Sequence, residues 1–384
     1  MTTSPANSLR PTVSEITAPT TLVRRTEQLA GEAVARELDG VLVSASVSVR
    51  YLSGYTGSHG IVLLGSAPSQ PWRFFTDFRY LTQAAEQVPE RFERQIATNL
   101  FEAALRSLQE LGSQGGRLGF EDEHVSVAQH AKLLEELPSG WELVPCTGMV
   151  EGLREIKDAG ELARIRAAAE LVDEVLGWQA ERGLTGRSER EVALELEHEM
   201  RRRGATAPSF PSIVASGAQG ALPHASPRDV TIVRGDLVTI DMGALLDGYC
   251  SDCTRTFATA EPDGQAREVY ATVLDAQQQG LQAVLAGSSG RQVDAVARAV
   301  IADAGYGENF GHGLGHGVGL EIHEAPRLSP SAPQEPLRPG HVVTVEPGVY
   351  LPAVLGVRIE DLVVVGADGP ERLSHFPKEL TVVG

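Results

Sequence analysis

The sequence has 384 residues, more than one domain usually holds, so two domains are expected. Hydrophobic residues make up 42% of the chain, enough for a substantial core, yet no apolar run reaches the length of a membrane helix. With 33 basic against 51 acidic residues, the formal net charge of -18 argues against nucleic acid as a partner. Only three cysteines are present, which is typical of a reducing compartment. We therefore expect a cytoplasmic protein that binds neither nucleic acid nor membranes.

The first part of the chain predicts a short tail and a small domain. Residues 1–20 are rich in Ser, Thr and Pro and are expected to be a flexible segment. Residues 21–150 alternate between short apolar runs, such as Gly40-Val41-Leu42-Val43, and stretches with helical spacing, such as 101–111. This alternation predicts an α/β domain. The sequence does not indicate a chemical function for this domain.

From residue 151 onward the pattern changes to pairs of helices followed by strands. Asp158 can cap a helix over 161–178, and Ser188 with Glu191 forms a capping box for a second helix. Strands are expected at 230–233, 237–242, 249–257, 342–345 and 358–365, and further helices at 267–285 and 293–304. Helices followed by strands, twice over, predict an α+β domain over 151–384 in which two related halves close around a sheet.

Two acids flank a predicted hairpin. An apolar strand ends in Asp241, an Asp247-Gly248 turn follows, and a second strand carries Asp252. Both acids lie about equally far from the turn, so we expect them to face each other across the ladder. Like charges placed directly opposite destabilise a sheet, and a bound cation would relieve the repulsion. The alternative is a pair of solvated acids on an edge hairpin.

Three of the ten histidines, His312, His316 and His323, lie within twelve positions. Four glycines in the octet 310–317 disfavour a helix and let the backbone approach a ligand closely. One buried histidine is usually a satisfied core residue, but three in a glycine-rich tract favour a binding site. A phosphate cradle also uses such glycines, but the Lys-Ser/Thr pair and the strand-loop-helix context are missing.

Two further acids, Glu346 and Glu360, stand on or at the end of apolar strands, where a lone carboxylate is costly to bury. Arg358 and Glu360 are expected to share one strand face. The arginine is therefore predicted to orient the Glu360 carboxylate as a partner behind the metal ligands. Each of these features is weak when taken singly.

The combined set is specific, and it resembles a known family. Five residues carry the resemblance, in this order and spacing: Asp241, Asp252, His316, Glu346 and Glu360. They resemble the metal ligands of the metallopeptidase family of methionine aminopeptidase, aminopeptidase P and prolidase, which has the pita-bread fold. The resemblance covers residues 151–384. In the N-terminal region, Tyr51-Leu52-Ser53-Gly54-Tyr55-Thr56-Gly57 is similar to the smaller, creatinase-like domain of the proline-specific branch.

The resemblance implies a site for two divalent metal ions. Asp252 and Glu360 would bridge the ions, Asp241 would chelate one of them, and His316 with Glu346 would complete the other. Four carboxylates balance the charge of two divalent cations, which leaves Lewis acidity to deprotonate a water. One nitrogen and many oxygens favour manganese or cobalt, with zinc as a further alternative.

The same resemblance implies how a peptide is bound. His224 and His323 would hydrogen-bond the peptide and stabilise the oxyanion, while Glu346 would shuttle a proton to the leaving nitrogen. Three more side chains match substrate-side positions of the proline-specific branch: His312, Phe210 and Ile322. For Phe210 and Ile322, packing in the core is almost as good an explanation.

The implied activity is hydrolysis of the peptide bond that precedes a proline. Arg327, four residues after His323, resembles the arginine that some prolidases use to bind the C-terminal carboxylate of a dipeptide. A dipeptidase is therefore preferred to an aminopeptidase acting on longer Xaa-Pro peptides, although a surface arginine in a Pro-rich loop is an alternative. Metal-free binding proteins with this fold form another class, and they would lack several of the five ligands. The resemblance also implies a homodimer.

Overall fold

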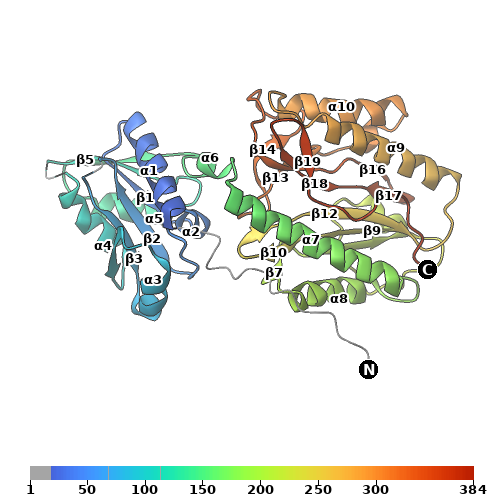
Figure 1. Cartoon of the computed structure of the whole chain (residues 1–384), viewed down its shortest axis with the longest axis horizontal. Helices are drawn as coiled ribbons and strands as arrows, with labels where there is room; N and C mark the ends of the chain where they lie inside the picture. The colour runs from blue at the N-terminus through green and yellow to red at the C-terminus, as the bar shows by residue number, and fades with distance from the viewer. Residues whose placement is uncertain (1–18, 68, 113) are drawn as a thin grey trace. The chain divides into compact units, whose positions relative to one another are not determined.

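The computed structural model describes residues 19–67, 69–112 and 114–384, and the chain divides into two compact units, Met1–Arg154 and Glu155–Gly384 (Figure 1). The predicted flexible segment 1–20 lies outside the described residues, except for Pro19 and Thr20, which begin helix α1 (Pro19–Ala35). Within the described part of the chain, every helix is too short or too polar to cross a membrane.

The first unit is built on a mixed sheet with helices packed against it (Figure 1). The strand order is β4 (Phe92–Ile96), β3 (Trp72–Thr76), β2 (Gly60–Gly65), β1 (Gly40–Val43), β5 (Gly116–Phe120) and β6 (Trp141–Pro145). Strand β1 pairs antiparallel with β2 and parallel with β5. Its helices are α1, α2 (Ser46–Ser53), α3 (Leu81–Gln87), α4 (Leu100–Arg106), α5 (Val127–Glu136) and α6 (Glu151–Arg154). The predicted α/β domain is confirmed, although helix α4 ends at Arg106 and continues only as the 3₁₀ turn Ser107–Glu110.

Side-chain caps fix where the helices of the second unit begin. Its helices are α7 (Ala159–Arg182), α8 (Glu189–Arg202), α9 (Gly264–Gln282) and α10 (Gly290–Asp303). The Asp158 carboxylate accepts from the backbone amides of Gly160 and Glu161, and Ser188 forms the predicted capping box with Glu191. Ser289 caps α10 in the same way. Each cap satisfies amides that have no partner inside the helix, so the predicted caps Asp158 and Ser188 are confirmed. Helices α9 and α10 each begin three residues earlier than predicted.

Two main sheets lie between these helices. One contains β8 (Ile213–Ser216), β9 (Leu237–Met242) and β12 (Cys253–Ala258), in the order β12-β9-β8. The other has the order β14 (Glu324–Leu328), β13 (Gly315–Gly317), β15 (Val342–Val345), β18 (Asp361–Val365) and β19 (Pro370–Arg372). Shorter pairings complete the unit: β10 (Ala244–Leu246) with β7 (Ala207–Pro208) and β11 (Tyr249–Cys250), and β16 (Gly348–Leu351) with β17 (Leu355–Arg358).

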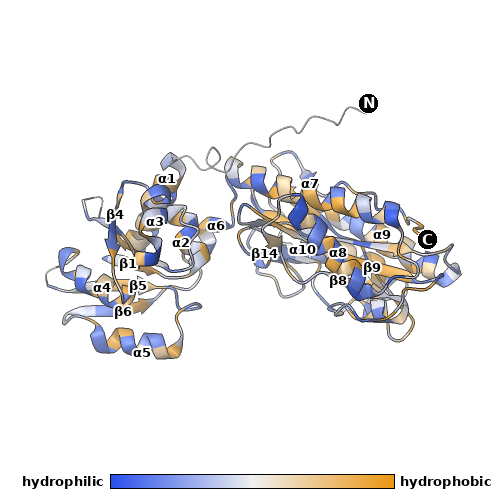
Figure 2. Ribbon diagram, turned by 90° about the horizontal axis from the view of Figure 1, so that it is seen from below, coloured by the Kyte–Doolittle hydropathy of each residue, from blue (hydrophilic) through white to orange (hydrophobic). Residues whose placement is uncertain are grey.

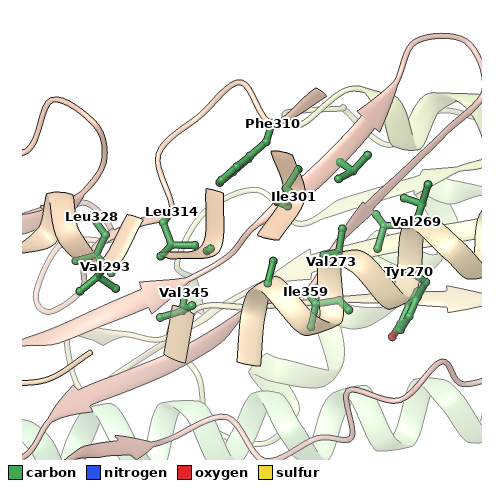
Figure 3. Close-up of a cluster of buried hydrophobic side chains, with 14 of the residues drawn as sticks. Val269, Tyr270, Val273, Val293, Ile301, Phe310, Leu314, Leu328, Val345 and Ile359 are labelled. Atoms are coloured by element: carbon green, nitrogen blue, oxygen red, sulfur yellow. The ribbon is translucent and has the colours of Figure 1, made fainter. Parts of the chain in front are cut away.

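Each helix pair covers its own core. Helices α7 and α8 bury residues such as Val175 and Leu196 against Ile240 of β9. Helices α9 and α10 bury Val273 and other apolar residues in a cluster that includes residues of β15 and β18. Figure 3 shows Val273 and Val293 of these helices in the same cluster as Val345 of β15. In Figure 2 these helices alternate between apolar and polar colours along their length, as expected for helices with one buried face. The predicted α+β architecture with two helix-and-sheet halves is confirmed.

The structure corrects three predicted strands. Residues 230–233 do not form a strand, because Val230 and Val233 are exposed and only Thr231 makes a bridge, to Ser188. The predicted strand 249–257 is interrupted at residues 251–252, and the predicted strand 358–365 is interrupted at residues 359–360. Each interruption contains one of the predicted metal ligands, so these acids leave the ladder and their side chains are free to converge.

Candidate metal centre and active site

Three carboxylates lie close together in the second unit. Asp241 lies in β9, Asp252 follows β11, and Glu360 precedes β18. One oxygen of each carboxylate lies within 4.8 Å of the other two. Burial raises the pKa of Asp252 and of Glu360 well above the ordinary value, and the neighbouring carboxylates raise both further. In the protein alone, these acids resist ionisation.

The convergence does not arise as the hairpin pattern predicted. Asp241 is paired with Thr254 of β12, not with Asp252, and the Asp247-Gly248 turn belongs to the separate β10–β11 hairpin. The prediction that the two acids oppose each other in one ladder is therefore wrong. The irregular residues 251–252 shift the register, and they carry the Asp252 carboxylate toward Asp241 from outside the ladder.

Unsatisfied oxygen atoms show that this arrangement fits a cation. Asp241 Oδ1, Asp252 Oδ1 and Glu360 Oε1 are buried, and no described residue donates a hydrogen bond to them. A buried carboxylate oxygen without a donor is costly. Divalent cations bound by these oxygens would offset both the repulsion and the lost hydrogen bonds. The donor set is that of a hard or borderline metal ion.

His316 and Glu346 stand beside the carboxylates. His316 Nε2 lies 3.4 Å from Glu346 Oε1 and 3.6 Å from Asp252 Oδ2. Its Nδ1 lies 3.0 Å from the carbonyl oxygen of Gly317, which can only accept, so Nδ1 carries the proton. Burial lowers the pKa of His316 to about 4, so the ring is neutral and Nε2 presents a lone pair to the acids.

The hydroxyl of Thr344 ties these two residues together. It donates to Glu346 Oε1 at 3.1 Å and accepts from the backbone amide of His316 at 3.0 Å. Burial raises the pKa of Glu346 to about 7, and the charge of Asp241 raises it while Arg358 opposes the rise. A carboxyl group with a pKa near neutrality is suited to exchanging protons.

Arg358 binds a different acid from the one predicted. Its Nη2 donates to Asp241 Oδ2 at 2.7 Å, whereas the carboxylate of Glu360 accepts from the hydroxyl of Thr254 at 2.7 Å. Glu360 follows the end of β17, so it does not share a strand face with Arg358 as predicted. Hydrogen bonds connect Arg358 to Glu360 only through Thr254, because the Arg358 Nε donates to Thr254 Oγ1 at 3.2 Å.

A chain of hydrogen bonds joins Arg358 to His312. Arg358 Nη1 donates to the Tyr350 hydroxyl at 3.0 Å, and this hydroxyl lies 2.9 Å from His312 Nε2. His312 Nδ1 lies 2.7 Å from the Gly313 carbonyl oxygen and therefore carries the proton, so Nε2 accepts from Tyr350. Burial lowers the pKa of His312 to about 4, which keeps the ring neutral.

Three further predicted residues are exposed: His224, His323 and Arg327. The His323 ring lies edge-on to the His316 ring, with the centroids 4.5 Å apart. Burial, followed by the charges of Arg327 and His224, lowers the pKa of His323. The charge of His224 also lowers the pKa of His312, and that of Arg327 lowers the pKa of His316. His224 and Arg327 are therefore within electrostatic reach of the site.

Phe210 and Ile322 are both half-buried. The backbone of Ile322 acts on the pKa of His316, which places this segment beside the ring, whereas Phe210 follows β7. Their assignment to a proline pocket stays a prediction.

Three residues of the site were not predicted: Thr254, Thr344 and Tyr350. Thr344 carried a signal, because it lies two positions before Glu346, a spacing that keeps strand residues on one face. Thr254 and Tyr350 carried none, since their contacts with Glu360 and His312 depend on how distant segments fold together.

Comparison with known proteins identifies the class. Residues 163–367, more than half of the chain, match the family model described as Metallopeptidase family M24, and residues 25–156 match the Creatinase/Prolidase N-terminal domain. The chain therefore belongs to metallopeptidase family M24 and is an enzyme of that family. The predicted pita-bread fold with a smaller creatinase-like domain is confirmed.

Individual relatives cover nearly the whole chain. An uncharacterised peptidase of Bacillus subtilis, YqhT, is 41% identical over 346 residues, which span 90% of this chain and 96% of the relative. The solved structure of a Xaa-Pro dipeptidase from Bacillus anthracis has a TM-score of 0.89 and 40% identity, and covers 95% of this chain and 100% of that chain. An X-Pro aminopeptidase from Thermotoga maritima MSB8 has a TM-score of 0.85 and 35% identity, with 94% and 100% covered.

Proposed function

We propose that this chain is an Xaa-Pro dipeptidase with two divalent metal ions in its active site. The observation that carries the choice of a dipeptidase is the state of Arg327. Its side chain is exposed, makes no ion pair with any described residue, and acts electrostatically on His316 and His323. An unpaired guanidinium beside the site is suited to binding the C-terminal carboxylate of a dipeptide.

The residues proposed to hold the metal ions are those of the acidic cluster and its histidine. Asp252 and Glu360 would bridge the ions, Asp241 would chelate one, and His316 with Glu346 would complete the other. When bound, the ions would supply the Lewis acidity that makes a water nucleophilic near neutral pH. The oxygen-rich donor set supports manganese, with cobalt or zinc as substitutes.

The side chains around the cluster have complementary tasks in this proposal. Glu346 would pass a proton from the attacking water to the leaving nitrogen. His323 and His224 would donate hydrogen bonds to the scissile peptide and to the oxyanion. His312, Ile322 and Phe210 would contact the proline side of the substrate. We also propose that the protein is cytoplasmic and forms a homodimer. Light scattering on the purified chain would test the dimer.

Three substrates test the dipeptidase proposal: Ala-Pro, Ala-Pro amide and Ala-Pro-Ala, each hydrolysed after dialysis against chelator and addition of Mn²⁺. We expect the wild type to prefer Ala-Pro by about 100-fold in kcat/KM, since losing a charged hydrogen-bond partner costs a few kcal/mol. Arg327→Ala should lose most of that preference through a raised KM. The matched control is Arg291→Ala, because Arg291 lies on α10 and donates to the Ala332 carbonyl instead.

The other outcomes are informative. If Ala-Pro-Ala is cut as well as Ala-Pro and Arg327→Ala changes little, the chain is an Xaa-Pro aminopeptidase, the activity named for the Thermotoga maritima structure. If no metal binds and Mn²⁺ restores no hydrolysis of any of the three, the proposal of a dinuclear Xaa-Pro peptidase is wrong.

A further inference from the structure

An ion pair on α10 points at the glycine-rich histidine tract. Asp294 and Arg298 lie one turn apart, and Arg298 donates from Nε and Nη2 to both carboxylate oxygens at 2.8 Å. The carboxylate of Asp294 is buried, with its side chain 2% exposed, while the arginine is 27% exposed. A solvated surface pair of this spacing contributes little to stability. The burial of Asp294 indicates that this pair has another use.

The Asp294–Arg298 pair binds backbone groups of the tract 310–314. Arg298 Nη1 donates to the Phe310 carbonyl at 2.9 Å, and Nη2 donates to the His312 carbonyl at 2.7 Å. Asp294 Oδ1 accepts from the Leu314 amide at 3.0 Å. One side-chain pair therefore binds every second residue of the tract 310–314.

The tract needs such an external constraint. Gly311 and Gly313 alternate with the bound residues, and glycine leaves the backbone conformation open. The tract has no helix or strand between residues 310 and 314 to hold it. Phe310 and Leu314 anchor the two ends in the buried cluster that contains Val293 of α10 (Figure 3). The guanidinium of Arg298 also lies 4.2 Å from the centre of the Phe310 ring. His312 lies between these two residues, and its backbone carbonyl accepts a hydrogen bond from Arg298.

We propose that Arg298 is a positioning residue that fixes the backbone of His312 so that the imidazole meets Tyr350 and the substrate together. The inference rests on the substrate-side role of His312 in the proposed function. The His312 ring is bound by the Gly313 carbonyl and the Tyr350 hydroxyl, so its direction depends on the backbone conformation of residues 312 and 313. Arg298 holds the His312 carbonyl, which belongs to the peptide group between these two residues, and Asp294 orients Arg298.

Binding these groups requires the several N–H donors of a guanidinium. Arg298 serves two carbonyls and a carboxylate at once, with donors in one rigid plane. A lysine keeps the charge and can still reach Asp294, but its single ammonium cannot span the same three acceptors. Arg298→Lys therefore separates the charge from the geometry.

The kinetic test uses the full-length enzyme loaded with Mn²⁺ and Ala-Pro as substrate. We expect Arg298→Lys to lower kcat/KM about tenfold, because a small displacement of a substrate-contacting group is costly. If Arg298 acts through His312, the double variant Arg298→Lys/His312→Gln should be no slower than His312→Gln alone. Arg291→Lys, on the same helix, should behave as wild type. Losses that multiply in the double variant would overturn the proposal.

A second readout does not depend on hydrolysis. In protein labelled with ¹⁵N-histidine, the His312 ring, assigned through His312→Gln, should show a proton on Nδ1 and a hydrogen-bonded Nε2. We expect Arg298→Lys to shift or broaden these signals and Arg291→Lys to leave them unchanged. Unchanged His312 signals in Arg298→Lys would also overturn the proposal, even if the wild type cuts no Xaa-Pro peptide and the proposed function fails. If Arg298→Lys does not fold, Asp294→Asn decides in the same assay, since it keeps Oδ1 as the acceptor for Leu314 but removes the negative charge and the acceptor of Arg298 Nε.

Discussion

Arg358 donates from Nη2 to Asp241 Oδ2 at 2.7 Å, while the other oxygen of the same carboxylate, Oδ1, is buried and accepts no hydrogen bond from a described residue. The arginine therefore fixes the direction of the carboxylate and leaves one oxygen for a cation. Asp252 and Glu360 each present a bare buried oxygen as well. The proposal of a metal site in this cluster therefore rests on the unsatisfied atoms as well as on the charges.

Replacing Arg358 should weaken metal binding without touching a ligand. We expect Arg358→Lys to lower the affinity for Mn²⁺ by about 10- to 100-fold, because partners behind metal ligands have effects of that size. Calorimetric titration of the metal-free protein measures it. Arg166→Lys is the control, since Arg166 binds Glu371 in an exposed pair at 2.9 Å. Equal affinities for the two variants would show that Asp241 needs no orientation.

The hydroxyl of Thr254 should matter to Glu360 in the same way. Thr254→Val preserves the shape but removes the donor to Glu360 and the acceptor for Arg358 Nε. We expect about a tenfold loss of Mn²⁺ affinity. Thr239→Val is the matched control, because Thr239 is buried and its hydroxyl pairs with that of Thr256. Both variants should lose about 1 kcal/mol of stability, but only Thr254→Val should bind metal more weakly.

The stability of the metal-free protein should fall as the pH rises from about 4.5 through 7. Burial raises the pKa of Glu346 from 4.5 to about 7, so in this window the folded state binds a proton that the unfolded state has released. Metal ions bind the ionised acids and compete with protons. Thermal unfolding with and without Mn²⁺ should therefore show a larger stabilisation by metal at pH 8 than at pH 5.5. A stabilisation independent of pH would contradict the assignment of Glu346.

Glu189 should support the fold through its charge. It is fully buried at the start of α8 and binds Ser216 and Arg228. Burial alone would raise its pKa, but the hydrogen bonds from Arg228 and Ser216 lower it overall. Its contribution is therefore present above pH 4.5 and is lost as the pH falls through the lower folded pKa.

We expect Glu189→Gln to lower the free energy of unfolding by about 2 kcal/mol at pH 7, as for a lost charge-assisted hydrogen bond. In urea unfolding, the difference from wild type should shrink below pH 4.5. A difference that stays constant down to pH 3 would mean that Glu189 acts through its shape and not its charge.

The sequence by itself determined the features that depend on neighbouring residues. Helix starts followed from Asp158 and from the pair Ser188 with Glu191, because a cap binds amides only two or three positions away. The five proposed ligands were recognisable because each stands at the end of an apolar strand or in a glycine-rich tract, and their order and spacing resemble one family. The caps depend only on residues a few positions apart, and the family resemblance depends only on the order and spacing of residues along the chain.

Only the tertiary structure decided which groups touch. Arg358 binds Asp241, 117 positions away, instead of its neighbour Glu360, because β17 ends at Arg358 and the chain turns out of the ladder before Glu360. Asp252 meets Asp241 from outside the hairpin because residues 251–252 interrupt the strand. Such contacts depend on register and on where a strand is broken, and a one-residue change in either reverses the face to which a side chain points.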